Sequence, residues 1–235
     1  MVGFDFSHLP ARLQAVAALV LPGSTVADVG TDHALLPLYL AGSGRCPLVI
    51  AIEAVPGPFR RALAAVNAAG LAGRVEVRQG DGLAPLQPGE VDTVVMAGLG
   101  ALTQQQILSA RPEVRQSLQR LVLQPQGDAG PLRRYLVAAG WRLEAEELVY
   151  ERGHYYPILA AGQGKSPSYS DLEWQVGPLL VQCRHPLLRE YLLYKMEKIT
   201  GVLRRLEDGR SSRTRERHAE LKRQLEGIRE LLARV

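Results

Sequence analysis

The stretch that decides the fold of this chain is STVADVGTDH, residues Ser24–His33. It begins as a short buried strand and then delivers Asp28 and Gly30 to a tight turn. A turn of this kind, at the carboxyl end of a parallel strand, is where an α/β sheet holds a nucleotide-like ligand. The stretch therefore predicts a ligand site at the end of this strand.

Similar residues end the next predicted strands. Glu53 follows the apolar run Leu48–Ile52, about twenty residues after the turn, a spacing that lets a carboxylate accept hydrogen bonds from both hydroxyls of a ribose. Asp81 follows a third strand and Gly98 a fourth. Since parallel strands end at the same edge of a sheet, we expect these residues to line one site.

Short apolar strands alternate with helix-length segments through the first 165 residues, the pattern of βαβ units around a parallel sheet. The strands are predicted near Thr25–Val29, Leu48–Glu53, Val75–Arg78, Thr93–Ala97, Leu121–Leu123, Arg142–Glu151 and Tyr155–Ala161. The short Gly153-His154 turn joins the last two. This order predicts a seven-stranded, doubly wound sheet with a final antiparallel hairpin, as in Rossmann-like class I methyltransferases and unlike dinucleotide-binding domains.

Proline and glycine mark the helices between these strands. Pro58 is predicted at the first position of a helix that Gly70 ends, and Pro131 and Gly140 bracket another helix in the same way.

The C-terminal part of the chain has a different pattern. A composition break at Gly162–Ser168 is the predicted linker, which gives domains at 1–165 and 166–235. Beyond it, leucine and isoleucine recur at spacings of three, four or seven over 188–206 and 221–235. With a break at Asp208–Ser212, these two amphipathic helices are predicted to form a coiled-coil-like antiparallel hairpin.

This C-terminal part also carries the basic excess. Residues 1–165 hold 14 Lys and Arg against 14 Asp and Glu, whereas residues 166–235 hold 14 against 10. A cationic appendage on a neutral domain suggests a polyanionic partner, because phosphate neutralisation gives sequence-independent affinity. The alternative is a solvated helical surface.

Composition excludes several classes of protein. The chain has 235 residues, 46% of them hydrophobic, enough for one α/β domain and a smaller appendage. It has no run near the roughly 18 apolar residues of a membrane span and no leader pattern, so we expect a soluble, cytoplasmic protein. Cys46 and Cys183 lack a surrounding Cys or His cluster, which argues against a disulfide framework and against a metal site.

The turn after the first strand suits a methyl transfer from S-adenosylmethionine. The sulfonium of this cofactor already activates the methyl group, so the protein has to bind the cofactor and orient a nucleophile towards the methyl carbon. Positioning alone lowers the activation barrier by roughly 7–11 kcal/mol. Asp28 and Asp32 are predicted to face the methionyl ammonium, and Gly30 to let the chain pass close to the ligand. Asp32 and His33 also stand where the dinucleotide fingerprint needs glycines, and a carboxylate repels a pyrophosphate but attracts an ammonium.

The nucleoside end of this cofactor is assigned to the next two strand ends. Glu53 is predicted to accept hydrogen bonds from the ribose hydroxyls, and Asp81 to accept one from the adenine amine. Gly80 and Gly82 flank Asp81, and Gly82 leaves space beside the ring. The alternatives are that Asp28 is a buried turn former and that Glu53 is a helix-capping carboxylate.

The fourth strand end reads MAGLGA, residues Met96–Ala101. Amine-directed adenine methyltransferases have an Asp/Asn-Pro-Pro-aromatic tetrapeptide here, and this chain has neither its acceptors nor its ring. Small residues favour close approach of a base and a ring nitrogen as methyl acceptor, since that nitrogen presents a lone pair. Asp28, Asp32 and His33 are then the candidates that take up a proton, although His33 is equally well explained as a turn residue.

Other polar residues are candidates for ligand contacts. Arg12, on a helix before the first strand, is placed to reach a phosphate or the cofactor carboxylate. Gln124 and Pro125 end the fifth strand, where a substrate mouth is expected. Tyr155 and Tyr156 are either core or base-stacking residues.

Taken together, these motifs resemble the bacterial tRNA (adenine(22)-N1)-methyltransferases, over essentially the whole chain. The matching blocks are Leu9–Leu13, Ala27–Ala34 with Leu36-Pro37, Glu53 with Gly57–Phe59, Gly80–Leu83, Ala97–Gly100 and Leu123–Pro125. As a set the blocks are specific to this family, whereas any one of them alone is common.

The resemblance implies a class I methyltransferase fold, S-adenosylmethionine as cofactor, and methylation of N1 of an adenine in the D-arm region of tRNA. The helical hairpin would help to hold the RNA, and a monomer is favoured. The implied cofactor site comprises Arg12, Asp28, Gly30, Asp32, His33, Glu53, Ala54, Gly80, Asp81, Gly82, Ala97, Gly98 and Leu99. The implied substrate site comprises Gly98, Gly100, Gln124 and Pro125.

Two residues depart from the family pattern. Ala101 stands where a second glycine is usual, and Asp81 where asparagine is common. An added methyl group is tolerable, and Asp accepts a hydrogen bond from an amine at least as well as Asn does. Two other functions stay open from the residues alone: methylation of a small molecule or protein, and non-catalytic RNA binding with a vestigial pocket.

Overall fold

The structure is a computed structural model that describes residues 9–206 and 212–235. By its internal contacts the chain divides into two units, the first ending at Pro167 and the second beginning at Ser168. Each unit is described by itself.

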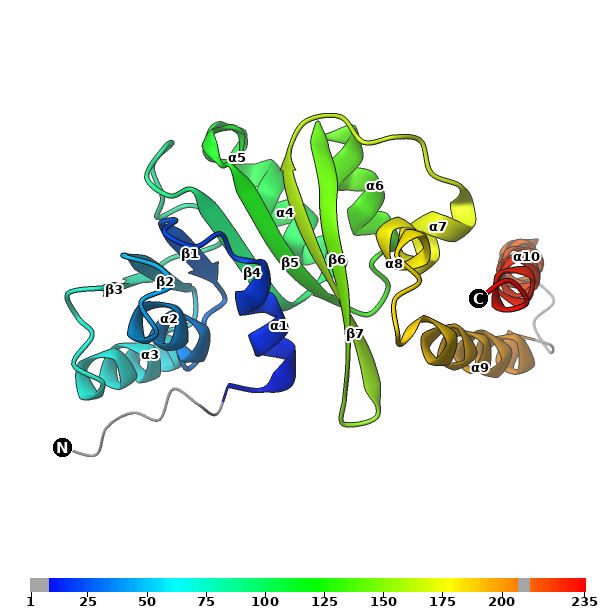
Figure 1. The fold of residues 1–235 in the computed structure, drawn as a ribbon, viewed down its shortest axis with the longest axis horizontal. Helices are drawn as coiled ribbons and strands as arrows, with labels where there is room; N and C mark the ends of the chain where they lie inside the picture. Colours follow the sequence, from blue (N-terminus) through cyan, green and yellow to red (C-terminus); the bar gives the residue numbers. More distant parts are fainter. Residues whose placement is uncertain (1–8, 207–211) are drawn as a thin grey trace. The chain divides into compact units, whose positions relative to one another are not determined.

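A seven-stranded sheet forms the centre of the first unit (Figure 1). Its strands are β1 (Val26–Val29), β2 (Val49–Glu53), β3 (Val75–Gln79), β4 (Thr93–Gly100), β5 (Arg120–Gln126), β6 (Trp141–Glu151) and β7 (His154–Gln163). The order across the sheet is β3-β2-β1-β4-β5-β7-β6. Strands β1 to β5 are parallel, and β7 is antiparallel to both β5 and β6. The seven predicted strands and the final antiparallel hairpin are confirmed.

Within residues 9–167, six helices cover the two faces of this sheet. They are α1 (Ala11–Leu19), α2 (Leu35–Gly42), α3 (Pro56–Ala68), α4 (Ala101–Ala110), α5 (Pro112–Ser117) and α6 (Gly130–Ala138). Helices α1, α2 and α3 share one buried apolar cluster with the sheet, while α4 and α6 pack on the other face (Figure 1). Because β1 and β2 are covered on both sides, all nine of their residues are buried, which explains their continuous apolar sequence.

The helix ends differ from the predictions by small amounts. Helix α3 begins at Pro56, so Pro58 is its third residue and not its first. The predicted stop at Gly70 is confirmed, since α3 ends at Ala68 and Gly70 has a left-handed backbone with a φ of +68°. Strand β7 continues to Gln163 and so takes in the start of the predicted linker.

The second unit is helical. It contains α7 (Asp171–Val176), α8 (Pro178–Gln182), α9 (Leu188–Leu206) and α10 (Ser212–Leu232). Ser170 caps α7 through a reciprocal capping box with Glu173. Within the described residues, no helix is long and apolar enough to span a membrane.

The predicted amphipathic pair packs as a helical hairpin. Leu203 of α9 is buried with Leu221 and Leu225 of α10, and neighbouring apolar residues of α9 complete this cluster. These contacts confirm the predicted seam between the two helices. The predicted break at Asp208–Ser212 lies outside the described residues, except for Ser212, which begins α10.

Candidate functional site

The carboxyl ends of five parallel strands lie along one edge of the sheet. In the strand order, the end of β1 is flanked by those of β2 and β4, with β3 and β5 beyond them. Because β7 runs antiparallel to β5, its first residues lie at this same edge. The predicted residues from separate parts of the sequence are thus brought to a common edge, at the place where the strand order reverses.

The turn after β1 has an unusual backbone. Gly30, Asp32 and Ala34 all have positive φ, of 79°, 48° and 54°. Such values are uncommon for residues with a side chain, so neighbouring groups have to hold the turn. The amides of Gly30 and Thr31 both donate to the carbonyl of Ile52, at 2.9 and 3.1 Å. This ties the turn to the end of β2.

Glu53 connects the turn to the start of α3. Its Oε2 accepts from the amide of Asp32 at 3.2 Å, and its Oε1 from the amide of Val55 at 3.0 Å. The side chain is buried, yet each carboxylate oxygen has a second lone pair for a ligand. Glu53 is therefore a fixed carboxylate, held by the amide of Asp32 in the turn and by the amide of Val55, the residue before α3.

Asp28 lies beneath this turn and is buried. Burial raises the pKa of its carboxyl from 3.8 to about 6, the Thr31 hydroxyl opposes this effect, and the negative charge of Glu53 adds to it. The site thus concentrates two carboxylates at neighbouring strand ends and favours a ligand with positive charge.

The other two predicted acid–base residues are at the surface. The Asp32 side chain is 58% exposed and pairs with Arg61 Nη2 at 3.1 Å, while His33 Nε2 lies 3.5 Å from Asp32. The structure therefore separates the three candidates, with Asp28 buried and Asp32 and His33 facing solvent. Arg61 was not predicted, because nothing in the sequence of α3 points to a partner 29 residues away.

The loop after β3 requires small residues. A Cβ on Gly80 would lie 2.3 Å from the Pro85 ring, and one on Gly82, where φ is +55°, would lie 3.0 Å from Ile107. The Gly80 amide donates to the Glu53 carbonyl at 3.1 Å, which ties this loop to β2. Asp81 is exposed between the two glycines.

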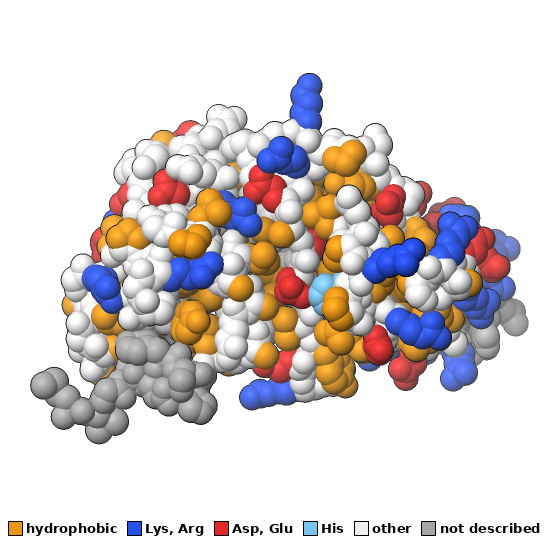
Figure 2. Space-filling model, viewed as in Figure 1, with side chains coloured by type: hydrophobic (Ala, Val, Ile, Leu, Met, Phe, Trp, Pro, Cys, Tyr) orange, Lys and Arg blue, Asp and Glu red, His pale blue; other side chains and the backbone are white. Residues whose placement is uncertain are grey.

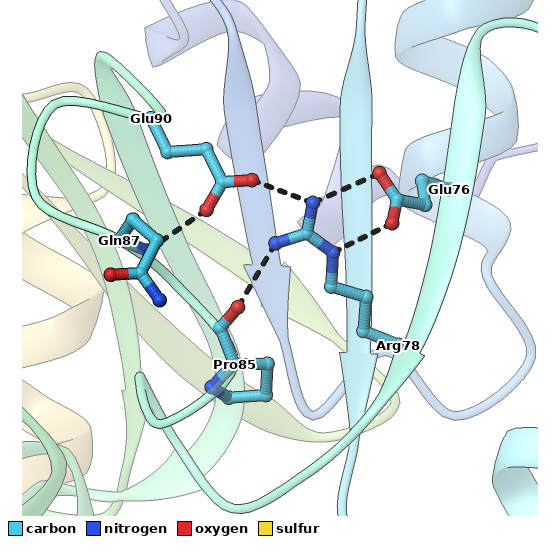
Figure 3. A network of polar contacts seen from close by, with 5 residues as sticks. All are labelled: Glu76, Arg78, Pro85, Gln87 and Glu90. Atoms are coloured by element: carbon cyan, nitrogen blue, oxygen red, sulfur yellow. Dashed lines mark hydrogen bonds and ion pairs between the residues drawn. The ribbon is translucent and has the colours of Figure 1, made fainter.

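A cluster of charged side chains holds the far part of the same loop (Figure 3). Arg78 donates to Glu76 at 2.8 Å, to Glu90 at 2.6 Å and to the Pro85 carbonyl at 2.9 Å. Glu90 also accepts from the Gln87 amide at 2.9 Å. The hydrogen bonds from Arg78 lower the pKa of both glutamates, so Glu76 and Glu90 are ionised at neutral pH.

The end of β4 is irregular and lined by small residues. The register with β5 shifts between Ala97 and Leu99, and Gly98 between them has a φ of +85°. A Cβ on Gly30 would lie 3.4 Å from Leu99 Cδ2, so the turn after β1 closely approaches this bulge. Gly100 then precedes α4. Such a strand end lets a planar ligand approach the backbone.

Arg12 lies over the ends of β4, β5 and β7. Its Nη1 donates to Gln124 Oε1 at 2.6 Å, and its guanidinium carbon is 5.5 Å from the centroid of the Tyr156 ring. A Cβ on Gly98 would be 3.7 Å from the same nitrogen. Within residues 9–206 and 212–235 no carboxylate pairs with Arg12, so its charge is held in place by neutral groups.

The Gln124 side chain does not line the mouth of the site, where it was predicted to contact the substrate. Its side chain is fully buried; the oxygen accepts from Arg12, and the nitrogen donates to the Pro125 carbonyl at 2.7 Å. Buried Gln104 of α4, which was not predicted, donates to the carbonyls of Leu99 and Gln124 at 3.0 and 3.1 Å. These amides join the ends of β4 and β5, and the polar groups beside Gly98 are Arg12 and Gln126, whose side-chain nitrogens would lie 3.7 and 3.9 Å from a Cβ there.

Comparison with known proteins adds to this geometry. Residues 26–230 match the family model described as tRNA (adenine(22)-N(1))-methyltransferase. The Bacillus subtilis protein of that name is 35% identical over 173 residues, which is 73% of each chain.

The chain belongs to the tRNA (adenine(22)-N(1))-methyltransferase family. The crystal structure of the B. subtilis enzyme superposes with a TM-score of 0.85 at 28% identity and covers 96% of this chain and 99% of that one. The structure of Streptococcus pneumoniae Sp1610 in complex with S-adenosyl-L-methionine gives a TM-score of 0.86 at 30% identity, covering 96% and 100%.

These matches confirm both the family and the class I methyltransferase fold that the sequence motifs predict.

The described residues contain no group of three or more His, Cys, Asp or Glu that could hold a metal ion.

Proposed function

We propose that this chain transfers a methyl group from S-adenosylmethionine to N1 of the adenine at position 22 of tRNA. The observation that carries the proposal is the fixed pair of carboxylates, Asp28 and Glu53, beside the small-residue end of β4, in a member of this family. The negative charge of the carboxylates suits a cationic sulfonium ligand, and the small residues at the end of β4 suit a planar base.

The donor set fits the cofactor at each of its ends. We assign the methionyl ammonium to Asp28 and, through water, to Asp32, with Gly30 as the close backbone approach and His33 at its rim. The ribose hydroxyls are assigned to the free lone pairs of Glu53.

The rest of the cofactor site follows from the neighbouring loops. The adenine amine is assigned to Asp81, with Gly80, Gly82 and Ala54 around the ring. Bound there, the cofactor supplies an electrophilic methyl group, so the protein has to orient its two ligands and exclude water.

We assign the methionyl carboxylate to Arg12. Gln124 and Tyr156 hold the guanidinium rigidly beside Gly98, and an uncompensated cation in a fixed position favours an anion. In this arrangement Gln124 positions Arg12 and does not itself contact the substrate, which replaces the direct contact predicted from the sequence. A phosphate of the RNA is the alternative anion for Arg12, and the Arg12→Gln variant distinguishes it from the cofactor carboxylate.

The target base is assigned to the small-residue strand end, formed by Ala97–Gly100 with Pro125. N1 of adenine attacks through its own lone pair, so no proton has to leave before the transfer. The product carries a positive charge, and a base acts only afterwards. Of the three proposed acid–base residues, Asp32 and His33 are exposed to solvent, whereas the buried Asp28 is assigned to stabilise the neighbouring cations.

The second unit is the proposed tRNA-binding domain. Lys and Arg side chains gather over α9 and α10 in Figure 2. Among the described side chains the exposed ones are Arg189, Lys198, Arg204, Arg205, Arg215, Arg217, Lys222, Arg223 and Arg229, with Arg234 just after α10. Neutralising phosphates with such residues supplies affinity without sequence readout, and the site at the sheet edge selects the base. We propose a monomer that works in the cytoplasm, where tRNA is modified.

The test is methylation of a tRNA transcript with labelled cofactor, followed by nucleoside analysis. The expected product is 1-methyladenosine, formed on a transcript with adenine at position 22 and not on one with guanine there. Cofactor binding is measured in parallel by calorimetry. A protein that binds cofactor but forms no 1-methyladenosine would overturn the substrate, and one that binds no cofactor would overturn the enzyme assignment.

Binding measurements on an Arg12 variant distinguish the two anions proposed for Arg12, the cofactor carboxylate and an RNA phosphate. We expect Arg12→Gln to weaken binding of the cofactor, measured by calorimetry, more than binding of tRNA, measured by gel shift. A loss of affinity for tRNA alone would assign Arg12 to an RNA phosphate and not to the cofactor carboxylate.

A further inference from the structure

The last two strands extend past the rest of the sheet. The β5–β7 ladder ends at the pair Leu123 and Leu159, whereas β6 and β7 stay paired as far as Glu151 and His154. Residues 147–151 and 154–158 therefore form a two-stranded ribbon about 16 Å long, visible in Figure 1 below the other strands. Because β7 is antiparallel to β5, this ribbon projects from the edge that carries the candidate site.

One face of the ribbon is anchored to the protein. Val149 and Ile158 pack in the apolar cluster that includes α1, and the Arg12 guanidinium lies over the Tyr156 ring. An isolated two-stranded ribbon is marginally stable in water, so this anchoring is what holds it in a defined position. A rigid projection at the mouth of a site is suited to contact a large substrate.

The opposite face carries an aromatic pair. Tyr150 stands directly across from Tyr155, with ring centroids 4.8 Å apart and ring planes at 46°. Alternation along the strands places this pair on the face away from Val149 and Tyr156. Tyr150 is 54% exposed, which is unusual for a large aromatic side chain that has no role in the core.

A basic residue follows Tyr150 two positions along the chain. Arg152 is exposed in the turn, where its φ is +49°, and Gly153 follows with a φ of +81°. The ribbon tip thus combines an exposed ring with a guanidinium a few residues away. Unpaired nucleotides are bound by this combination, because a ring stacks on a base while a cation neutralises the adjacent phosphate.

We propose that Tyr150, supported by Tyr155 and with Arg152 beside it, stacks an unpaired nucleotide of the tRNA next to the methylated adenine. This inference rests on the proposed function, since it assumes an RNA at the site. Paired bases hide their faces within the duplex, so the ribbon favours a loop or an extruded nucleotide. It gives the first unit an RNA contact of its own, separate from the basic helices.

The test compares methylation kinetics of variants of the full chain. Tyr150→Ala is expected to raise KM for tRNA roughly 5- to 150-fold, the effect of losing one base–aromatic stack, while kcat at saturating tRNA and cofactor affinity stay unchanged. Tyr150→Phe keeps the ring and is expected to match the wild type within about twofold. Arg152→Gln is expected to lower the slope of log affinity against log salt by about one phosphate contact.

Leu21→Ala serves as the matched control. Leu21 is also an exposed apolar side chain, at 37%, but it precedes β1 and so belongs to the opposite edge of the sheet. A Tyr150→Ala variant with wild-type KM would overturn the inference while leaving the proposed function intact, provided the wild type forms 1-methyladenosine. A Tyr150→Ala change in oligomeric state by sedimentation would also overturn it, because the ring would then belong to a contact between copies.

Discussion

Replacing the buried Asp28 by asparagine should stabilise the protein and abolish its cofactor binding. The folded protein raises the pKa of this carboxyl from 3.8 to about 6, mainly through burial. A shift of roughly two units corresponds to about 3 kcal/mol, which is the cost of carrying this charge in the folded state without a ligand. Asparagine removes the charge and keeps an oxygen that can accept from Thr31.

The sign of the effect sets its pH dependence. Because the pKa of the folded state lies above that of the unfolded state, the unfolded chain ionises first as the pH rises. The wild type therefore loses stability from about pH 4 to pH 6 relative to Asp28→Asn. We expect the variant to be up to about 3 kcal/mol more stable at pH 7.5, with the difference close to zero at pH 4.

Urea unfolding at pH 7.5 and pH 4, with and without S-adenosylhomocysteine, measures both effects. The wild type should gain stability from this ligand, and Asp28→Asn should gain little. Asp32→Asn is the matched control, since Asp32 is 58% exposed and its pair with Arg61 contributes little in water. A folded Asp28→Asn variant that is no more stable than the wild type at pH 7.5 would refute the argument that Asp28 is a charge held ready for a cation.

Three other substitutions test the division of roles. Glu53→Ala should weaken cofactor binding at least tenfold in calorimetry, since it removes a fixed carboxylate, and should leave tRNA affinity within about twofold; equal losses for both ligands would contradict this. Gly80→Ala should lower the free energy of unfolding by about 1–3 kcal/mol in urea, because its Cβ would lie 2.3 Å from a proline ring, and Gly73→Ala, with open space around it, should not. Neutralising Arg204 and Arg205 together should lower the salt slope of tRNA binding by about two and leave calorimetric cofactor affinity unchanged; an unaltered slope would remove these residues from the interface.

The sequence predicted the positions of the strands well because burial determined their residues. Strands β1 and β2 are covered on both faces, and their uninterrupted apolar runs record this directly. The same holds for Gly70, where a left-handed backbone at a helix end favours glycine. The start of α3 was placed two residues too late, since either Pro56 or Pro58 can occupy a first turn.

Roles of polar side chains were harder to predict. Gln124 ends a strand at the expected edge, yet its amide turns inward to Arg12, a residue 112 positions earlier. Asp28 and Asp32 are four residues apart and both acidic, but one is buried and the other pairs with Arg61 at the surface. The predicted strand Thr25–Val29 includes Asp28 and so indicated its burial, whereas nothing in the local sequence indicated the pairing of Asp32 with Arg61.

By itself, the sequence determined the order of strands and helices, the seam of the C-terminal helices and the set of strand ends that form the candidate site. These features follow from periodic burial and from backbone preferences, which act within a few residues. Only the tertiary structure decided how Arg12 is held, how Glu53 connects two loops and how far the pKa of Asp28 rises. Such properties depend on desolvation and on contacts between residues far apart in the chain, and neither leaves a periodic pattern in the sequence.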